Sequence, residues 1–389
     1  MKKIILLSFI ALNAIVANAQ WQQTSCPWTG EVMCFAISGS NIFAGTSIGV
    51  YLSSNDGNSW TQINTGLTST AVRALAISGS DIFSGTNSGG VFLSSNNGNN
   101  WSAVNSGLIS TNVRSLTIGG SNIFAGTGSN GVFLSSNNGS SWTATNNGLP
   151  SSPIQALIIN GSNIFAGTNN LGAYLSSNNG SSWFAVNTSL ASTDIFAFAI
   201  SGSNIFAGTY DGVFLSSNNG SSWTPKNTGL TTTDVRALTI SGSNIFAGTS
   251  TGGMFWSSNN GSSWVAKNTG LTNTYITALA ICGSYIYAGT NDGEIWQCLI
   301  SDIITGTEET INNNVNNIAV FPNPATNNIT IENSKYAVIE ILNIQGELMK
   351  TIAINYSHTI IDVSSFSIGM YFVKVKTEKG VTIRKFIKE

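Results

Sequence analysis

The chain carries very little charge. Only 8% of its 389 residues are Asp, Glu, Lys or Arg, against about 25% in average soluble domains. The formal net charge is −2, and setting aside the N-terminal Lys2 and Lys3 makes it −4. A nearly neutral, slightly acidic surface attracts neither nucleic acid nor an acidic membrane, so we expect no nucleic-acid partner.

Histidine is almost absent. The single histidine is His358, near the C-terminus, and residues 20–300 contain neither histidine nor a Cys-x-x-Cys pair. This excludes a Ser-His-Asp or Cys-His site and a His-ligated metal from that region. We expect no metal and no cofactor.

Cysteine is scarce and unevenly placed. Cys26 and Cys34 lie near the start, Cys282 and Cys298 near residue 300, and none lies between them. In an exported protein, four cysteines allow three disulfide connectivities. We expect at least one disulfide to join the two ends of residues 20–300.

Long hydrophobic runs are confined to the N-terminus. Met1–Ala19 has two lysines, an apolar stretch and an Ala-Asn-Ala ending, which predicts a signal peptide over residues 1–19 that is cleaved after Ala19. No later run reaches the length of a membrane span, so we expect no transmembrane segment.

What the chain does contain is a repeat. Variants of Ser-Ser-Asn-Asn-Gly-Ser-Ser-Trp occur six times, 40 or 41 residues apart, and end at Trp60, Trp101, Trp142, Trp183, Trp223 and Trp264. Each repeat holds four short apolar segments separated by Gly- and Asn-rich turns. This period and these lengths are typical of a four-stranded propeller blade, and the frequent glycines disfavour helices.

The number of repeats predicts a closed ring. A Gly-Thr pair recurs seven times, at Gly45, Gly85, Gly126, Gly167, Gly208, Gly248 and Gly289, although the octet occurs only six times. The last repeat lacks its fourth segment, and Trp21 precedes Trp60 by 39 residues. We therefore expect Trp21–Ser25 to pair with Glu294–Cys298 and to close a monomeric, all-β, seven-bladed propeller over residues 20–300.

The octet resembles the Asp-box of BNR-type propellers, a family of sialidases, binding propellers and assembly factors. An asparagine stands where that family usually has aspartate, at Asn55, Asn96, Asn137, Asn178, Asn218 and Asn259. An amide oxygen also closes such a turn. The family's box lies away from its active site, so the resemblance implies a fold rather than a reaction.

The C-terminal part has a different composition. Residues 301–317 are polar and aperiodic, which predicts a flexible linker, and residues 318–389 alternate in polarity as in a small antiparallel β-sandwich. Val320–Ala325, Asn343–Leu348, Ser367–Val375 and Arg384–Lys388 resemble the C-terminal sorting domain of the type IX secretion system of Bacteroidetes. This resemblance implies recognition by that machinery and delivery to the outer-membrane surface or the medium.

Variation between repeats indicates where a ligand would bind. The turns hardly change, whereas the loop after Gly-Thr and two positions opening the first strand vary from repeat to repeat. Those two positions are Glu31/Met33, Ala71/Arg73, Asn112/Arg114, Pro153/Gln155, Asp194/Phe196, Asp234/Arg236 and Tyr275/Thr277. We expect both variable sets on one face around a central channel, where they bind a glycan or a surface protein. The candidate binding residues are Arg73, Arg114, Gln155, Tyr210, Arg236 and Tyr275.

Other functions remain open at this point. Asp194, Asp211 and Asp234 could serve as the carboxylates of a polysaccharide hydrolase, or they could be turn residues. The three arginines share a repeat position and resemble the arginine triad of sialidases, but that enzyme family has six blades. A scaffold that assembles other secreted components is the third alternative.

Overall fold

The computed structural model of the protein describes residues 21–305, 319–332, 337–343, 347–354, 356, 358–377 and 380–389. The chain forms two compact units, Met1–Gly306 and Thr307–Glu389. The expected signal peptide over residues 1–19 and residues 306–317 of the expected linker lie outside the described residues.

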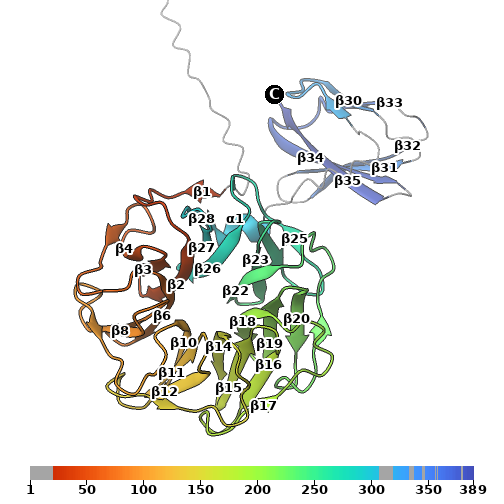
Figure 1. The fold of residues 1–389 in the computed structure, drawn as a ribbon. Coiled ribbons are helices and arrows are strands. Elements are labelled where there is room, and N and C mark those ends of the chain that lie inside the picture. Colours follow the sequence, from red (N-terminus) through yellow and green to blue (C-terminus); the bar gives the residue numbers. More distant parts are fainter. Residues whose placement is uncertain are drawn as a thin grey trace, which may run out of the picture. The chain divides into compact units, whose positions relative to one another are not determined.

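The first unit contains seven four-stranded antiparallel sheets (Figure 1). Six are each built from consecutive strands, and the seventh combines the last three strands with β1 from the N-terminal segment. The first strands are β2 (Val32–Ser38), β6 (Val72–Ser78), β10 (Val113–Gly119), β14 (Ile154–Asn160), β18 (Ile195–Ser201), β22 (Val235–Ser241) and β26 (Ile276–Cys282). The second strands are β3 (Asn41–Thr46), β7 (Asp81–Thr86), β11 (Asn122–Thr127), β15 (Asn163–Thr168), β19 (Asn204–Thr209), β23 (Asn244–Thr249) and β27 (Tyr285–Thr290).

The remaining strands lie further out in each sheet. The third strands are β4 (Gly49–Ser53), β8 (Val91–Ser94), β12 (Val132–Ser135), β16 (Ala173–Ser176), β20 (Gly212–Ser216), β24 (Met254–Ser257) and β28 (Ile295–Leu299). The fourth strands are β5 (Thr61–Gln62), β9 (Ser102–Ala103), β13 (Thr143–Ala144), β17 (Phe184–Ala185), β21 (Thr224–Pro225), β25 (Val265–Ala266) and β1 (Gln22–Gln23).

The first strands stand around a common centre, as Figure 1 shows. Each contacts the first strand of the next sheet, from β2 and β6 through β22 and β26, and β26 contacts β2. Glycines in the second strands allow this approach. A Cβ on Gly289 of β27, for example, would lie 2.5 Å from Cγ1 of Val32 in β2.

Aromatic side chains form the core between neighbouring sheets. The row of Phe43, Phe83, Phe124, Phe165, Phe206, Phe246 and Tyr287 is at most 1% exposed. The tryptophans at the ends of the octets are also buried, and five of them donate an indole N–H to a backbone carbonyl of the preceding repeat, as Trp101 does to Ile63 at 2.7 Å. These rings are therefore structural, since each is enclosed by packing.

The octet turns are closed by asparagine. In the first, Oδ1 of Asn55 accepts hydrogen bonds from the Ser53 hydroxyl and from the backbone N–H of Ser59, both at 3.0 Å. The Gly57 N–H donates to the Ser53 hydroxyl at 2.9 Å. The same three bonds recur in the other five octets. An amide oxygen thus supplies the acceptor that the turn requires.

The N-terminal segment completes the last sheet. Gln22 pairs with Gln297 and Gln23 with Trp296, so the predicted pairing of this segment with Glu294–Cys298 is confirmed. The Trp21 indole donates to the Lys267 carbonyl at 2.7 Å, the bond that the octet tryptophans make in other sheets. Trp21 therefore takes the place of the missing seventh octet tryptophan.

The expected disulfide is wrong. All four cysteines are free, and their sulfur atoms face different partners. The Cys34 thiol lies 3.8 Å from the Val72 carbonyl, and the Cys282 thiol lies 3.6 Å from the Gly39 carbonyl. The ends of the first unit are joined instead by the β1–β28 pairing and the burial of Trp21.

The buried thiols are predicted to be unreactive in the folded protein. Burial raises the pKa of Cys34 and of Cys298 to about 12, and only the thiolate is strongly nucleophilic. We expect both to resist iodoacetamide at pH 8 and to react fully in denaturant, with the mass shift of peptides as the measurement. A disulfide-linked peptide in the non-reduced digest would contradict this.

The boundary of the first unit differs slightly from the expected one. The sequence places the linker from Ser301, whereas helix α1 (Ile300–Thr305) continues the structured chain. Ile303 is fully buried in the cluster that contains Trp21 and Trp296. An apolar residue within a polar stretch thus extends the core by one helical turn.

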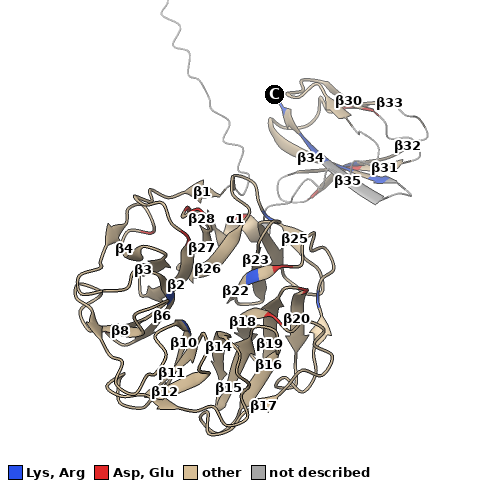
Figure 2. Cartoon of the chain, in the orientation of Figure 1, with Lys and Arg blue, Asp and Glu red and all other residues tan. Residues whose placement is uncertain are grey.

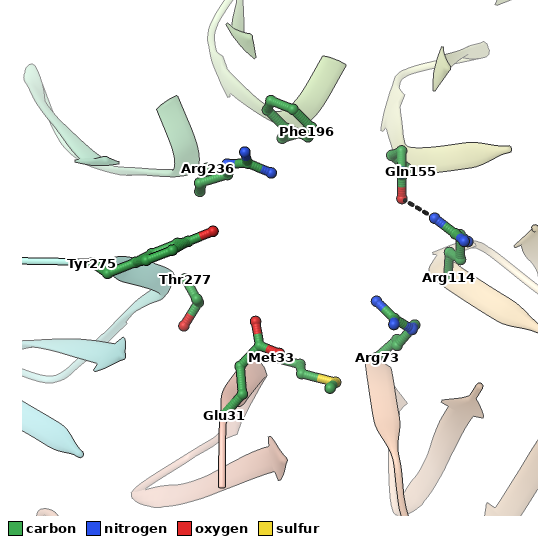
Figure 3. Close-up of a pocket in the computed structure, with 9 residues that line it drawn as sticks. All are labelled: Glu31, Met33, Arg73, Arg114, Gln155, Phe196, Arg236, Tyr275 and Thr277. Carbon is green, nitrogen blue, oxygen red and sulfur yellow. Dashed lines mark hydrogen bonds between the residues drawn. The ribbon is translucent and has the colours of Figure 1, made fainter. Parts of the chain in front are cut away.

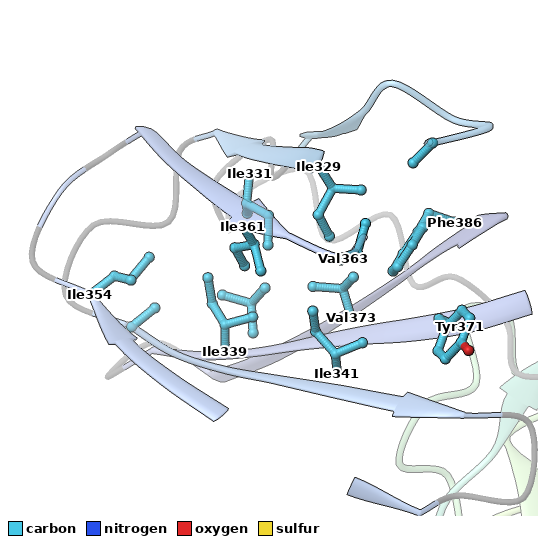
Figure 4. Close-up of a cluster of buried hydrophobic side chains, with 13 residues drawn as sticks. Ile329, Ile331, Ile339, Ile341, Ile354, Ile361, Val363, Tyr371, Val373 and Phe386 are labelled. Atoms are coloured by element: carbon cyan, nitrogen blue, oxygen red, sulfur yellow. The ribbon is translucent and has the colours of Figure 1, made fainter. Parts of the chain in front are cut away.

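The second unit contains two antiparallel sheets. The smaller has the order β29 (Ala319–Phe321), β30 (Asn328–Glu332), β33 (His358–Asp362), and the larger has the order β32 (Leu348–Ile354), β31 (Ala337–Asn343), β34 (Gly369–Thr377), β35 (Gly380–Lys388). Inward side chains from both sheets, among them Ile329, Ile341 and Val373, form one buried cluster (Figure 4).

Candidate functional site

A β-bulge occurs at the same position in all seven first strands. In β6 the register shifts between Val72 and Ala74, so Arg73 is the extra residue. The corresponding residues of the other sheets are Met33, Arg114, Gln155, Phe196, Arg236 and Thr277. A bulge redirects a side chain away from the regular sheet face, and here it does so once in each sheet.

These seven residues line one cavity, which we call the mouth pocket. It has a volume of about 170 Å³, and its remaining lining residues are Glu31 and Tyr275. Figure 3 shows the side chains arranged in a ring around its centre. The bulges thus bring together the second variable position of every repeat, whereas only Glu31 and Tyr275 of the first positions line the pocket.

The loop after Gly-Thr lies at the same end of each sheet. Its first backbone N–H donates to the carbonyl of the residue two places before the bulge, as Asn87 does to Ala71 at 2.9 Å. The Arg73 Nε also donates to Asn87 Oδ1 at 3.0 Å. Both variable sets therefore share one face, as expected from the sequence.

The positive charge of the first unit is concentrated at this pocket. Residues 21–300 contain three arginines, Arg73, Arg114 and Arg236, and all three line it. Figure 2 shows the corresponding blue segments at the inner strands β6, β10 and β22. The pocket is therefore lined by three of the five Lys and Arg residues in this range.

Arg236 is held in place by its neighbours. Its Nε lies 2.6 Å from Asp234 Oδ1, and its Nη2 donates to Asp234 Oδ2 at 2.7 Å. Its guanidinium carbon lies 4.0 Å from the centroid of the Phe196 ring. An ion pair with one hydrogen bond, from Nη2 to Oδ2, and a cation–π contact hold this side chain, and the Asp234 carboxylate balances its charge.

Arg73 and Arg114 have no carboxylate partner among the described residues. Arg73 bonds to Asn87, and Arg114 Nη1 donates to Gln155 Oε1 at 3.1 Å. Burial, followed by the charge of Arg73, lowers the pKa of Arg114. Arg114 Nε and the neighbouring Asn112 Oδ1 are buried without a hydrogen-bond partner. Two neighbouring sheets thus present cationic groups whose charge is not balanced by an ion pair.

Five of the six candidate binding residues line the mouth pocket. The exception is Tyr210, which is 56% exposed in the turn between β19 and β20. Glu31, Met33, Phe196 and Thr277 line the pocket but were not selected from the sequence. All four belong to the variable pairs found in the sequence. Their position in the repeat was therefore the signal that could have identified them as lining residues.

The three candidate carboxylates do not form a cluster in the pocket, since none of them lines it. Asp194 Oδ1 accepts the backbone N–H of Asn170 at 2.9 Å, and the Asp211 N–H donates to the Thr209 hydroxyl at 3.1 Å. Asp234 pairs with Arg236. The carboxylates of Asp194 and Asp234 therefore have local structural contacts, whereas the contact of Asp211 is made by its backbone.

Two family models match parts of the chain. Residues 319–389 match the secretion system C-terminal sorting domain, and residues 13–164 match the DUF6242 beta propeller domain. No curated protein matches the chain. The second unit is thus similar to an export signal domain, and part of the first unit is similar to a known propeller domain.

Solved structures similar to the chain are propeller-like. The extracellular domain of a putative hybrid two-component system, BT3049 of B. thetaiotaomicron, aligns with a TM-score of 0.65 at 14% identity over 95% of this chain and 57% of its own. PorZ, a surface component of the type IX secretion system of Porphyromonas gingivalis, aligns with a TM-score of 0.60 at 16% identity, over 92% of this chain and 59% of its own. YCF48 from Cyanidioschyzon merolae aligns with a TM-score of 0.58 at 14% identity, over 72% of this chain and 99% of its own.

These similarities concern the fold. The chain spans less than two thirds of the length of BT3049 and PorZ. Within the residues that the structure describes, no helix is long and apolar enough to cross a membrane. The sorting domain indicates handling by the type IX secretion system, so the protein is delivered to the cell surface or the medium.

Proposed function

We propose that the protein is an exported, non-catalytic binding module whose ligand, a glycan or a surface protein, occupies the mouth pocket. In this proposal, residues 21–305 form a monomeric seven-bladed propeller of Asp-box type, closed by β1. The C-terminal β-sandwich directs export. The seven sheets, the contact between β26 and β2 and the asparagine-closed turns support this architecture.

One observation carries the proposal. All three arginines of residues 21–300 lie at bulges around a single pocket, whereas the surrounding turns repeat almost without change. Polar groups that converge on a cavity are the usual mark of a binding site. The repeat scaffold alone requires no charge at these positions, because Met33, Gln155, Phe196 and Thr277 occupy them in the other sheets.

A hydrolase has less support. Glycoside hydrolysis normally needs two carboxyl groups on either side of one bond, and the mouth pocket is lined by a single carboxylate, Glu31. A scaffold for secreted components would bind a protein at the same mouth pocket. It would differ from our proposal only in the identity of that protein partner, and the site would be the same.

The proposal is tested with the exported, full-length mature protein on arrays of glycans and of outer-membrane proteins. We expect binding without turnover, and we expect the double variant Arg73→Gln/Arg114→Gln to lose it. Lys226→Gln, which removes a positive charge outside the mouth pocket, serves as the matched control. Undiminished binding by the double variant, or cleavage of a bound polysaccharide, would contradict the proposal.

A further inference from the structure

The mouth pocket has an uneven distribution of charge, which restricts the ligand. Arg73 and Arg114 come from neighbouring sheets and face the cavity without an ion pair among the described residues. Glu31, just before β2, also lines the cavity and forms no ion pair with any described residue. The pocket therefore offers two free positive groups and one free negative group.

Arg236 contributes little positive charge that a ligand could use. Its ion pair with Asp234 already balances its charge, and its guanidinium lies over Phe196. A ligand would have to break that pair to use the guanidinium fully, which is costly for a half-buried side chain. The available anion site is therefore the one between Arg73 and Arg114.

Glu31 and Tyr275 form another part of the wall. They precede β2 and β26, whose sheets are neighbours, and the Tyr275 ring reaches toward the cavity in Figure 3. A carboxylate accepts hydrogen bonds from hydroxyl groups, and a tyrosine ring offers an apolar face with a polar end. This combination suits a ring that carries several hydroxyl groups.

The size of the cavity sets a further limit. Its volume is about 170 Å³, below the roughly 300 Å³ at which pockets for drug-sized ligands begin. A second cavity of about 310 Å³ shares Met33, Arg73, Arg114, Arg236 and Thr277 with it. The mouth pocket itself fits one monosaccharide unit, and further units of a polymer would lie beyond it.

We propose, resting on the function above, that the mouth pocket binds one uronic acid unit of an acidic polysaccharide. Its carboxylate lies between Arg73 and Arg114, its hydroxyl groups donate to Glu31, and its ring packs on Tyr275. Guanidinium groups match the planar geometry of a carboxylate. A neutral sugar would leave both cations unpaired, and a peptide carboxyl terminus would not supply the hydroxyl donors for Glu31.

Titration calorimetry of the full-length mature protein provides the test, with digalacturonate as the ligand. Its methyl ester and lactose serve as uncharged ligands, a sulfated disaccharide as the alternative anion, and a peptide with a free carboxyl terminus as the protein-like ligand. We expect digalacturonate to bind at least about tenfold more tightly than each of these, with affinity falling as NaCl rises.

Two substitutions separate the contacts. Arg114→Gln should weaken digalacturonate binding by at least about tenfold and remove most of the preference over the ester. Glu31→Ala should weaken binding of the ester, because it removes an acceptor for hydroxyl groups, and should weaken binding of the acid less, because it also removes a negative charge that repels the uronate. Lys226→Gln, a basic residue that does not line the mouth pocket, should change nothing.

The outcomes distinguish this inference from the proposed function. Preference for the ester, the sulfated sugar, lactose or the peptide would overturn the uronic acid assignment and leave a binding module with another ligand. Digalacturonate binding that Arg114→Gln does not weaken would also overturn it. No binding to any ligand here or on the arrays would overturn both.

Discussion

Gly107→Ala is expected to destabilise the first unit by about 3 kcal/mol or more. Gly107 has φ +81°, a left-handed conformation that alanine rarely adopts. A Cβ there would lie 2.2 Å from the carbonyl oxygen of Trp142. Neither segment can move freely, because the Trp142 N–H donates to the Ser106 carbonyl at 2.8 Å and the Leu108 N–H to Asn105 at 2.9 Å. Relief therefore requires the loss of the bond between Trp142 and Ser106 or of the turn bond between Leu108 and Asn105, in addition to the backbone strain.

Gly120→Ala is the matched control for this change. Gly120 also has a positive φ, of +61°, in a turn of the same unit, but no atom lies within 4 Å of the added Cβ. It should cost about 1 kcal/mol from the backbone alone. Denaturant unfolding followed by tryptophan fluorescence measures both. Equal losses would show that the contact with Trp142 has no effect of its own.

The sheets could be predicted from the sequence because every repeat carries the same four segments. Short apolar runs between Gly- and Asn-containing turns specify strands, and the 40-residue period places them in successive sheets. The role of Trp21 followed from its spacing to Trp60, and the structure places it in an octet tryptophan's position. These features could therefore be predicted because the sequence repeats.

The disulfide and the helix could not be predicted in the same way. Position along the chain placed Cys34 and Cys282 at opposite ends of the repeats, but it did not show the direction of their thiols. Cys34 faces β6, and Cys282 faces the turn after β2. Helix α1 occurs once, so no other copy could reveal that Ile303 is buried.

The site was predictable only in part. Variation between repeats identified the positions that line the mouth pocket, yet a bulge leaves no signature in a single strand, since Arg73, Gln155 and Phe196 all occupy it. Tyr210 varies as well, but its turn holds it outside the pocket. Variation between repeats thus identified the face that carries the mouth pocket. The backbone geometry determines which residues of that face line it.

Trp21→Ala is expected to lower the stability of the first unit by about 3–5 kcal/mol, the usual cost of removing a large buried ring. Trp21 is 2% exposed and packs with Met254, Ile276 and Trp296. Its backbone N–H and indole N–H hold it to the preceding sheet, at Thr269 and Lys267.

We expect this loss of stability because few other contacts hold the N-terminal segment in place. The strand β1 has only two residues, and both are exposed, so without the indole the edge of β28 would open to solvent. Gln22→Ala is the matched control because it retains the backbone pairing with Gln297. Thermal unfolding of the full-length mature protein should show a large decrease for Trp21→Ala and almost none for Gln22→Ala. Indistinguishable melting curves would mean that the N-terminal segment does not hold the first and last sheets together.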